Sequence, residues 1–116
     1  MSGQFVLKAS GDQFLFNLEA GNREVILTSE RYTAKASALK GIESVRENAG
    51  VEERFQKRLS SSDEPYFVLR AGNNEVLGTS EMYSSASARD RGIAAVKVAA
   101  PVAAVDDRTV SGKRGW

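Results

Sequence analysis

The sequence contains no cysteine and no histidine. Disulfides, thiolate zinc sites and cysteine nucleophiles are therefore excluded, as is the imidazole that most often serves as a general base. No run approaches the roughly 20 apolar residues of a membrane helix, and the opening residues, MSGQFVLKAS, lack the apolar segment of a secretion signal. We therefore expect a cytoplasmic protein with no membrane partner.

An excess of charge of either sign is also missing. Sixteen basic and fifteen acidic residues leave a formal net charge of +1, which gives no strong field to attract a polyphosphate or an anionic membrane. One local cluster is RFQKR at residues 54–58. With 41% hydrophobic and 27% charged residues, the 116-residue chain fits one ordinary globular domain with a solvated surface.

An internal repeat dominates what is present. At an offset of 51 residues, FNLEAGNREVILTSERYTAKASALKGIESVREN (16–48) aligns without gaps on FVLRAGNNEVLGTSEMYSSASARDRGIAAVKVA (67–99), and 14 of the 33 positions are identical. A match of this length indicates duplication. We therefore predict a single pseudo-twofold domain over residues 1–105, with a first unit at about 3–50 and a second at about 51–105. The tail DDRTVSGKRGW (106–116) has no periodicity and is predicted to be disordered, with Trp116 facing solvent.

Each unit is predicted to contain three strands and a helix. Phe14, Phe16 and Leu18 alternate with Leu15, Asn17 and Glu19, as in a half-buried strand. The AGN stretches that follow suit tight hairpins, because Gly21–Asn22 and Gly72–Asn73 tolerate positive φ. The segment VAAVDD is predicted to be a short strand or a frayed end.

A helix is predicted after the third strand of each unit. Thr33 and Ser84 are the expected N-caps. The apolar positions at helical spacing are Ala38, Ile42, Val45 and Ala49 in the first unit and Ile93, Val96 and Ala100 in the second. Both helices contain a central glycine, Gly41 or Gly92, although glycine costs about 1 kcal/mol relative to alanine there. We interpret these glycines as sites where the helix backbone packs closely on the sheet.

The paired signatures AGN-x-EV and TSE-x-Y, in the order strand-strand-strand-helix-strand, resemble the YegP-like family of small bacterial proteins. The resemblance covers about residues 3–108. It implies an α+β fold in which two β3αβ units form a single antiparallel sheet, exchange their terminal strands and place both helices on one face. Some relatives carry one unit and pair as dimers, so two units in one chain imply a monomer. The family brings no established activity, catalytic residue or ligand.

The repeated polar stretch, TSERY at 28–32 and TSEMY at 79–83, has two interpretations. As a folding element, it ends a strand, places a carboxylate near a helix N-terminus and buries a tyrosine ring. As a binding site, it supplies one cluster per unit. The candidate ligand-binding residues are Thr28, Glu30, Tyr32, Thr79, Glu81 and Tyr83.

Catalysis by this stretch has little support. Ser29 has no imidazole or adjacent lysine to remove its proton. Paired carboxylates for acid-base chemistry would require Glu24 to meet Glu30, or Glu75 to meet Glu81, around a cleft, and the spacing does not require either. We predict no catalytic residues, no metal and no cofactor, and the protein is not expected to be an enzyme.

The leading functional hypothesis is a noncovalent binding or interaction module with an unknown ligand. The alternative is nucleic-acid binding through a basic and aromatic sheet face, for which the candidate residues are Arg54, Arg58, Tyr66 and Arg70. Against this alternative stand the near-neutral net charge and the absence of a known nucleic-acid-binding signature. An enzyme ranks third.

Overall fold

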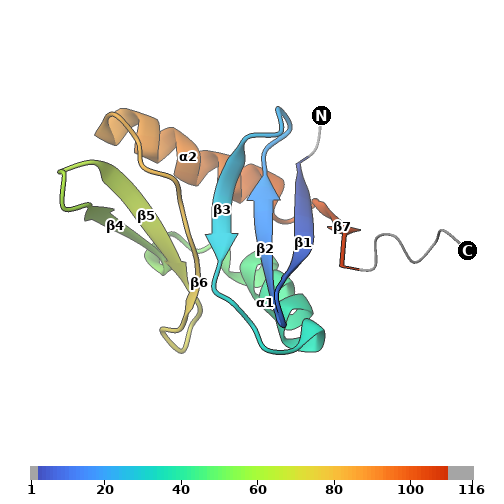
Figure 1. The fold of residues 1–116 in the computed structure, drawn as a ribbon. Coiled ribbons are helices and arrows are strands. Elements are labelled where there is room, and N and C mark those ends of the chain that lie inside the picture. Colours follow the sequence, from blue (N-terminus) through green and yellow to red (C-terminus); the bar gives the residue numbers. More distant parts are fainter. Residues whose placement is uncertain (1–2, 110–116) are drawn as a thin grey trace, which may run out of the picture.

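A computed structural model describes residues 3–109 and contains one seven-stranded sheet and two α-helices. The strands are β1 (Gln4–Ser10), β2 (Gln13–Glu19), β3 (Val25–Ser29), β4 (Phe55–Leu59), β5 (Pro65–Arg70), β6 (Val76–Thr79) and β7 (Ala104–Asp107). The helices are α1 (Lys35–Asn48) and α2 (Ala86–Ala99), and a short 3-10 turn, η1 (Glu52–Arg54), precedes β4. The strand order is β4-β5-β6-β3-β2-β1-β7, with both helices against one face of the sheet (Figure 1).

The two units meet at the centre of the sheet. β3 and β6 pair antiparallel, with Thr28 opposite Thr79, its equivalent in the other unit. After α1, the chain crosses to the far edge of the second unit and becomes β4. After α2, it returns to the first unit as β7. The predicted α+β fold with exchanged terminal strands is confirmed. β7 runs parallel to β1, so the sheet is mixed, whereas the pairings among β1–β6 are antiparallel.

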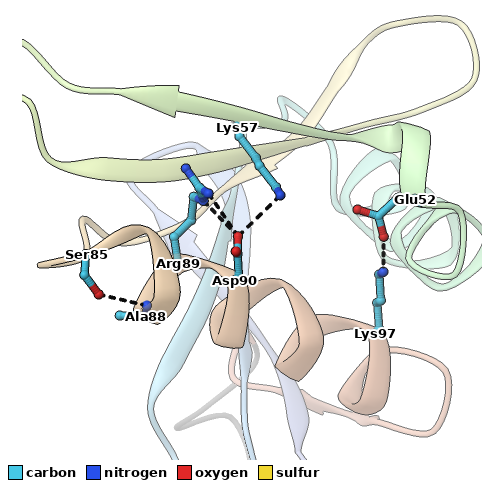
Figure 2. Close-up of polar contacts among 7 residues, drawn as sticks. All are labelled: Glu52, Lys57, Ser85, Ala88, Arg89, Asp90 and Lys97. Atoms are coloured by element: carbon cyan, nitrogen blue, oxygen red, sulfur yellow. Dashed lines mark hydrogen bonds and ion pairs between the residues drawn. The ribbon is translucent and has the colours of Figure 1, made fainter.

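Equivalent basic residues hold these two crossings in place. Arg46 on α1 donates from Nη2 to the carbonyl oxygen of Ala103, just before β7, at 2.7 Å, and its guanidinium lies over the Phe5 ring. Lys97, its counterpart on α2, bonds Glu52 just before β4 (Figure 2). Each helix therefore anchors the segment that follows the other helix.

The core lies between the sheet and the helices. The fully buried side chains include Phe5, Phe16, Leu18, Leu27, Ile42, Val45, Phe67, Leu69 and Val96. The predicted inward face of β2 is confirmed, because Phe16 and Leu18 belong to the core and Phe14 packs against it. Asn17, predicted to be on the half-exposed side, is buried as well. The predicted inward positions of both helices are confirmed as well.

Both AGN stretches form the expected hairpin turns, but the left-handed residue comes one position later than predicted. Arg23 has φ 71° and Asn74 has φ 73°. In the first hairpin, the Arg23 N–H donates to the carbonyl oxygen of Ala20, and the Asn22 side-chain oxygen accepts from the Glu24 N–H. The asparagine therefore serves as a hydrogen-bond acceptor inside the turn, and the residue after it adopts positive φ.

The helices begin later than the sequence predicts. Thr33 and Ser84 are not the N-caps, because Ala34 and Ser85 occupy those positions. Ser85 Oγ accepts from the Ala88 N–H at 3.0 Å (Figure 2). Ala34 has no side-chain acceptor, so α1 begins without the cap that α2 possesses.

This difference predicts that substituting each cap residue by the one at the other cap changes the free energy of unfolding in opposite directions. Ser85→Ala should lower the free energy of unfolding by about 1 kcal/mol, and Ala34→Ser should raise it by about 0.5–1 kcal/mol, because each change removes or adds one cap. Chemical denaturation of both variants measures these effects. A loss of stability in Ala34→Ser would show that the extended backbone at Ala34 does not present a serine to the helix.

β7 corrects the predicted start of the disordered tail. Asp106 and Asp107 belong to this strand, and the Arg108 N–H donates to the carbonyl oxygen of Leu7. The Lys35 ammonium lies 2.6 Å from Asp107 Oδ2. Hydrogen bonds from Lys35 and Thr109 lower the pKa of Asp107 to about 2. Residues 110–116 of the predicted tail, Trp116 included, lie outside the described residues.

Candidate functional site

The two threonines of the repeated stretch meet on the face of the sheet opposite the helices. Thr28 follows the core residue Leu27, so its side chain points away from the core. It lies opposite Thr79 in the register, and its Oγ1 accepts from Asn17 Nδ2 at 2.9 Å. The pair contributes to the central seam between the two units.

The two serines have an identical structural role, which the sequence analysis missed. Ser29 Oγ accepts from the Phe16 N–H at 2.9 Å and donates to the carbonyl oxygen of Glu30 at 2.7 Å. Ser80 makes the equivalent bonds, accepting from the Phe67 N–H and donating to the carbonyl oxygen of Glu81. Both serines are buried. The only signal in the sequence is that this hydroxyl recurs at the same place in both units.

The two tyrosines pack between the sheet and the helix of their own unit. The Tyr32 ring stacks on Phe16, with centroids 6.3 Å apart and planes at 9°. Its hydroxyl lies against Gly41, where an added Cβ would be 2.5 Å from the hydroxyl oxygen. Tyr83 and Gly92 repeat this arrangement at even closer range. The predicted close packing at the central glycines is therefore made mainly by the tyrosines, with the Phe16 ring of the sheet also 3.1 Å from a Cβ at Gly41.

The tyrosine hydroxyls lie near carboxylates from both units. Burial raises the pKa of Tyr32, with further contributions from the charges of Glu30 in its own unit and Glu75 in the other. Burial likewise raises the pKa of Tyr83, assisted by Glu81 and Glu24. Both phenols therefore stay neutral at ordinary pH. Within residues 3–109, no hydrogen-bond partner is found for either hydroxyl.

The glutamates of the repeated stretch do not have the predicted helix-dipole role. Glu30 and Glu81 are each five residues before their helix, and neither helix has an acidic residue in its first turn. Both side chains are exposed. Because the dipole effect falls off within one turn, these two carboxylates do not stabilise the helix starts in this way.

Glu81 instead lines a pocket between the units. This pocket, of about 460 Å³, is lined by Glu24, Val25, Ile26, Glu81 and Tyr83. Glu24 and the two aliphatic residues come from the β2–β3 hairpin of the first unit, and Glu81 and Tyr83 from the second. The carboxylates that line this pocket are therefore Glu24 and Glu81, one from each unit. Neither pair that acid-base chemistry would have required within one unit, Glu24 with Glu30 or Glu75 with Glu81, lines it.

Three of the four candidate nucleic-acid-binding residues, Arg58, Tyr66 and Arg70, share one face of the β4–β5 hairpin, and Arg54 does not join them. Arg58 and Tyr66 are register partners on β4 and β5. Arg70 bonds Gln56 and the carbonyl oxygen of Asn74. Arg54 lies elsewhere, because its Nε donates to Asn48 Oδ1 at the end of α1, at 2.9 Å.

Comparisons with known proteins establish the family. A family described as a domain of unknown function (DUF1508) matches twice, at residues 5–56 and 60–107. A UPF0339 protein of Bordetella pertussis is 57% identical over 109 residues, covering 94% of this chain and 98% of that protein. The UPF0339 protein YegP of Escherichia coli K12 is 50% identical over 110 residues, covering 94% of this chain and 100% of its own. The chain belongs to the YegP-like UPF0339 family.

Two solution NMR structures show that the YegP-like fold is shared. A UPF0339 protein of Shewanella oneidensis superposes with a TM-score of 0.91 at 46% identity, covering 100% of this chain and 99% of that one. YegP of E. coli, described as a protein of unknown function, superposes with a TM-score of 0.90 at 50% identity, and the match covers 97% of each chain. These relatives confirm a small α+β domain of a family whose function is not characterised.

Neither α1 nor α2 combines the length and the apolar composition that crossing a bilayer requires. Residues 3–109 also contain no group of three or more acidic side chains arranged to hold a metal ion. The candidate site is the pocket lined by Glu24, Glu81 and Tyr83.

Proposed function

We propose that this protein is a noncovalent binding module, not an enzyme, and that the pocket of Glu24, Glu81 and Tyr83 receives a positively charged group. The observation that carries this proposal is the difference between Glu81 and its neighbours in the repeated stretch. The Ser80 and Tyr83 side chains are used within the fold, and Thr79 pairs with Thr28 at the seam, whereas the Glu81 carboxylate is exposed and lines a pocket with a second carboxylate. A side chain that recurs in both units without a folding role is a candidate for binding.

The chemistry of the pocket favours a primary ammonium or guanidinium group. Two carboxylates accept charge-assisted hydrogen bonds, and a tyrosine ring attracts a cation through its face. Neither Glu24 nor Glu81 forms an ion pair with another side chain of the described part of the chain. Val25 and Ile26 offer an apolar surface to the carbon chain that would carry the cation.

The proposal predicts selective binding of a small amine. In an NMR titration, n-butylammonium should shift the backbone amide signals of Ile26, Glu81 and Tyr83, and butyrate should not. Glu24→Gln and Glu81→Gln should each weaken this binding about tenfold, because each removes one charge-assisted hydrogen bond. Glu64→Gln, an exposed carboxylate in the β4–β5 turn, provides the matched control.

Stability measurements on the same variants provide a second test. Glu81→Gln should leave the free energy of unfolding unchanged or raise it by several tenths of a kcal/mol, because residues held for a ligand are often neutral or unfavourable for the empty fold. A clear loss of stability together with no amine binding would overturn the proposal and restore a purely structural role. The cytoplasmic location, the monomeric state and the single-domain boundaries stay predictions.

A further inference from the structure

A second pocket, separate from the pocket of Glu24, Glu81 and Tyr83, lies along the outer side of α2. Its volume is about 480 Å³. It is lined by Gly3, Ala20, Gly21, Arg91, Ala94, Ala95, Val98, Ala99 and Val102. Two of the apolar side chains are strongly exposed, Val98 at 76% and Val102 at 67%. Apart from Arg91, the lining is therefore apolar, and it is open to solvent.

The duplication supplies a natural comparison, because the equivalent place beside α1 is already filled. At the offset of 51 residues, Gly72 corresponds to Gly21 and Asn48 to Ala99. Between them lies the side chain of Arg54, whose Nε donates to Asn48 Oδ1 and whose Nη2 is 3.3 Å from the position of a Cβ on Gly72. The architecture thus accommodates a group the size of a long side chain at this place.

The helix residues beside the α2 pocket and beside the equivalent place on α1 differ in polarity. Where α1 has Glu43, Ser44 and Glu47, α2 has Ala94, Ala95 and Val98. The filled place is thus polar and holds a guanidinium group, whereas the α2 pocket is apolar at these three positions. Losing three polar residues from one exposed helix face exposes apolar surface to water, which is unfavourable unless something covers that surface.

We propose that the α2 pocket binds a small molecule with an apolar chain or ring that ends in a carboxylate. The apolar part occupies the surface of Ala94, Ala95 and Val98. The carboxylate pairs with Arg91, the one charged residue of the lining. Arg91 is exposed and donates from Nη1 to Ser87 Oγ at 3.0 Å. Within residues 3–109 it forms no ion pair, so its charge is available to an anionic ligand.

Octanoate and octylammonium are matched probes, because they share an apolar chain and differ in the sign of their charge. In NMR titrations of the full chain, octanoate should give saturable shifts of the amide signals of Gly21, Ala95 and Val98. Octylammonium should bind this pocket about tenfold more weakly, the loss expected for one charged hydrogen bond. Arg91→Gln should reduce octanoate affinity to the octylammonium level.

Val98→Glu tests the apolar wall. It installs the residue that α1 has at Glu47, on an exposed position, so the fold should be kept, as thermal unfolding will show. Octanoate binding should then be lost, whereas Glu43→Gln on α1 should leave it unchanged. The proposal is overturned if octanoate gives no saturable shifts, if the shifts map elsewhere, or if binding survives Val98→Glu. Equal losses for both probes in Arg91→Gln would overturn the assignment of the carboxylate to Arg91.

Discussion

Residues 1–50 and residues 51–116, expressed separately, should each fail to fold as a stable monomer, and mixing them should restore the native structure. The reason is the exchanged architecture. The first fragment lacks β6 and β7, which flank its sheet on both sides, and the second lacks the β3 edge on which β6 pairs. Neither fragment alone covers the apolar face shared by Phe16, Leu27, Phe67 and Leu69.

The central seam also predicts that each fragment prefers the other to a copy of itself. Leu27 in the first unit corresponds to Gly78 in the second, and a Cβ on Gly78 would lie 2.7 Å from Leu27 Cγ and 3.1 Å from the carbonyl oxygen of Thr28. Two first units would bring two leucines together at this seam. Two second units would bring two glycines together and leave space unfilled. Leucine against glycine is the combination that packs well.

Circular dichroism and size-exclusion chromatography of the separate and mixed fragments test this prediction. Gly78→Leu in the second fragment should block reconstitution, and Leu27→Gly in the first should restore part of it by reversing the size difference. A cooperatively unfolding monomer of residues 1–50 would contradict the exchanged architecture. Stable homodimers of either fragment would contradict the selective role of Leu27 and Gly78.

The sequence predicted the arrangement of the elements because duplication and periodicity are local and repeated signals. A strand can be predicted from a short alternating pattern such as Phe14, Phe16 and Leu18, and the recurrence of the pattern 51 residues later supports that prediction. The resemblance to a family then supplied the exchange of strands. Features that depend on a single hydrogen bond are harder to predict from the sequence. The N-caps were therefore predicted one residue too early, at Thr33 and Ser84 instead of Ala34 and Ser85.

The candidate site was only partly predictable, because it forms across the two units. The repeated stretch identified Glu81 and Tyr83, but it could not bring Glu24 from the first unit beside them. Nor could it separate the roles within the stretch. The Ser80 hydroxyl has a structural role because it accepts a hydrogen bond from the Phe67 N–H on β5. The Tyr83 hydroxyl lies against Gly92 because α2 packs over the tyrosine. Such partners are set by tertiary packing rather than by spacing along the chain.

Gly41→Leu and Gly92→Leu should each destabilise the protein by about 1–3 kcal/mol through overpacking. In an ordinary exposed helix, replacing glycine with leucine would favour the helix by several tenths of a kcal/mol to 1 kcal/mol. Here the new Cβ meets a tyrosine hydroxyl at 2.5 Å or closer, and at Gly41 it also lies 3.1 Å from the Phe16 ring. The tyrosine would have to leave its stacked position, so the steric cost exceeds the gain in propensity. Gly50→Leu, in the turn just after α1, is the control for the added side chain itself, because nothing lies within 4 Å of a Cβ there.

A double-mutant cycle identifies the tyrosine as the cause. In a Tyr32→Ala background, where the hydroxyl and ring are gone, Gly41→Leu should cost much less or become stabilising. The coupling between the two sites should then be about 1–3 kcal/mol, within the range measured for residues in direct contact. Urea denaturation of the four proteins supplies the numbers. Additive effects would show that the sheet, rather than Tyr32, requires the glycine. Coupling at both Gly41 and Gly92 would instead assign the tyrosine of the repeated stretch to folding in each unit, leaving its glutamate as the residue free to bind.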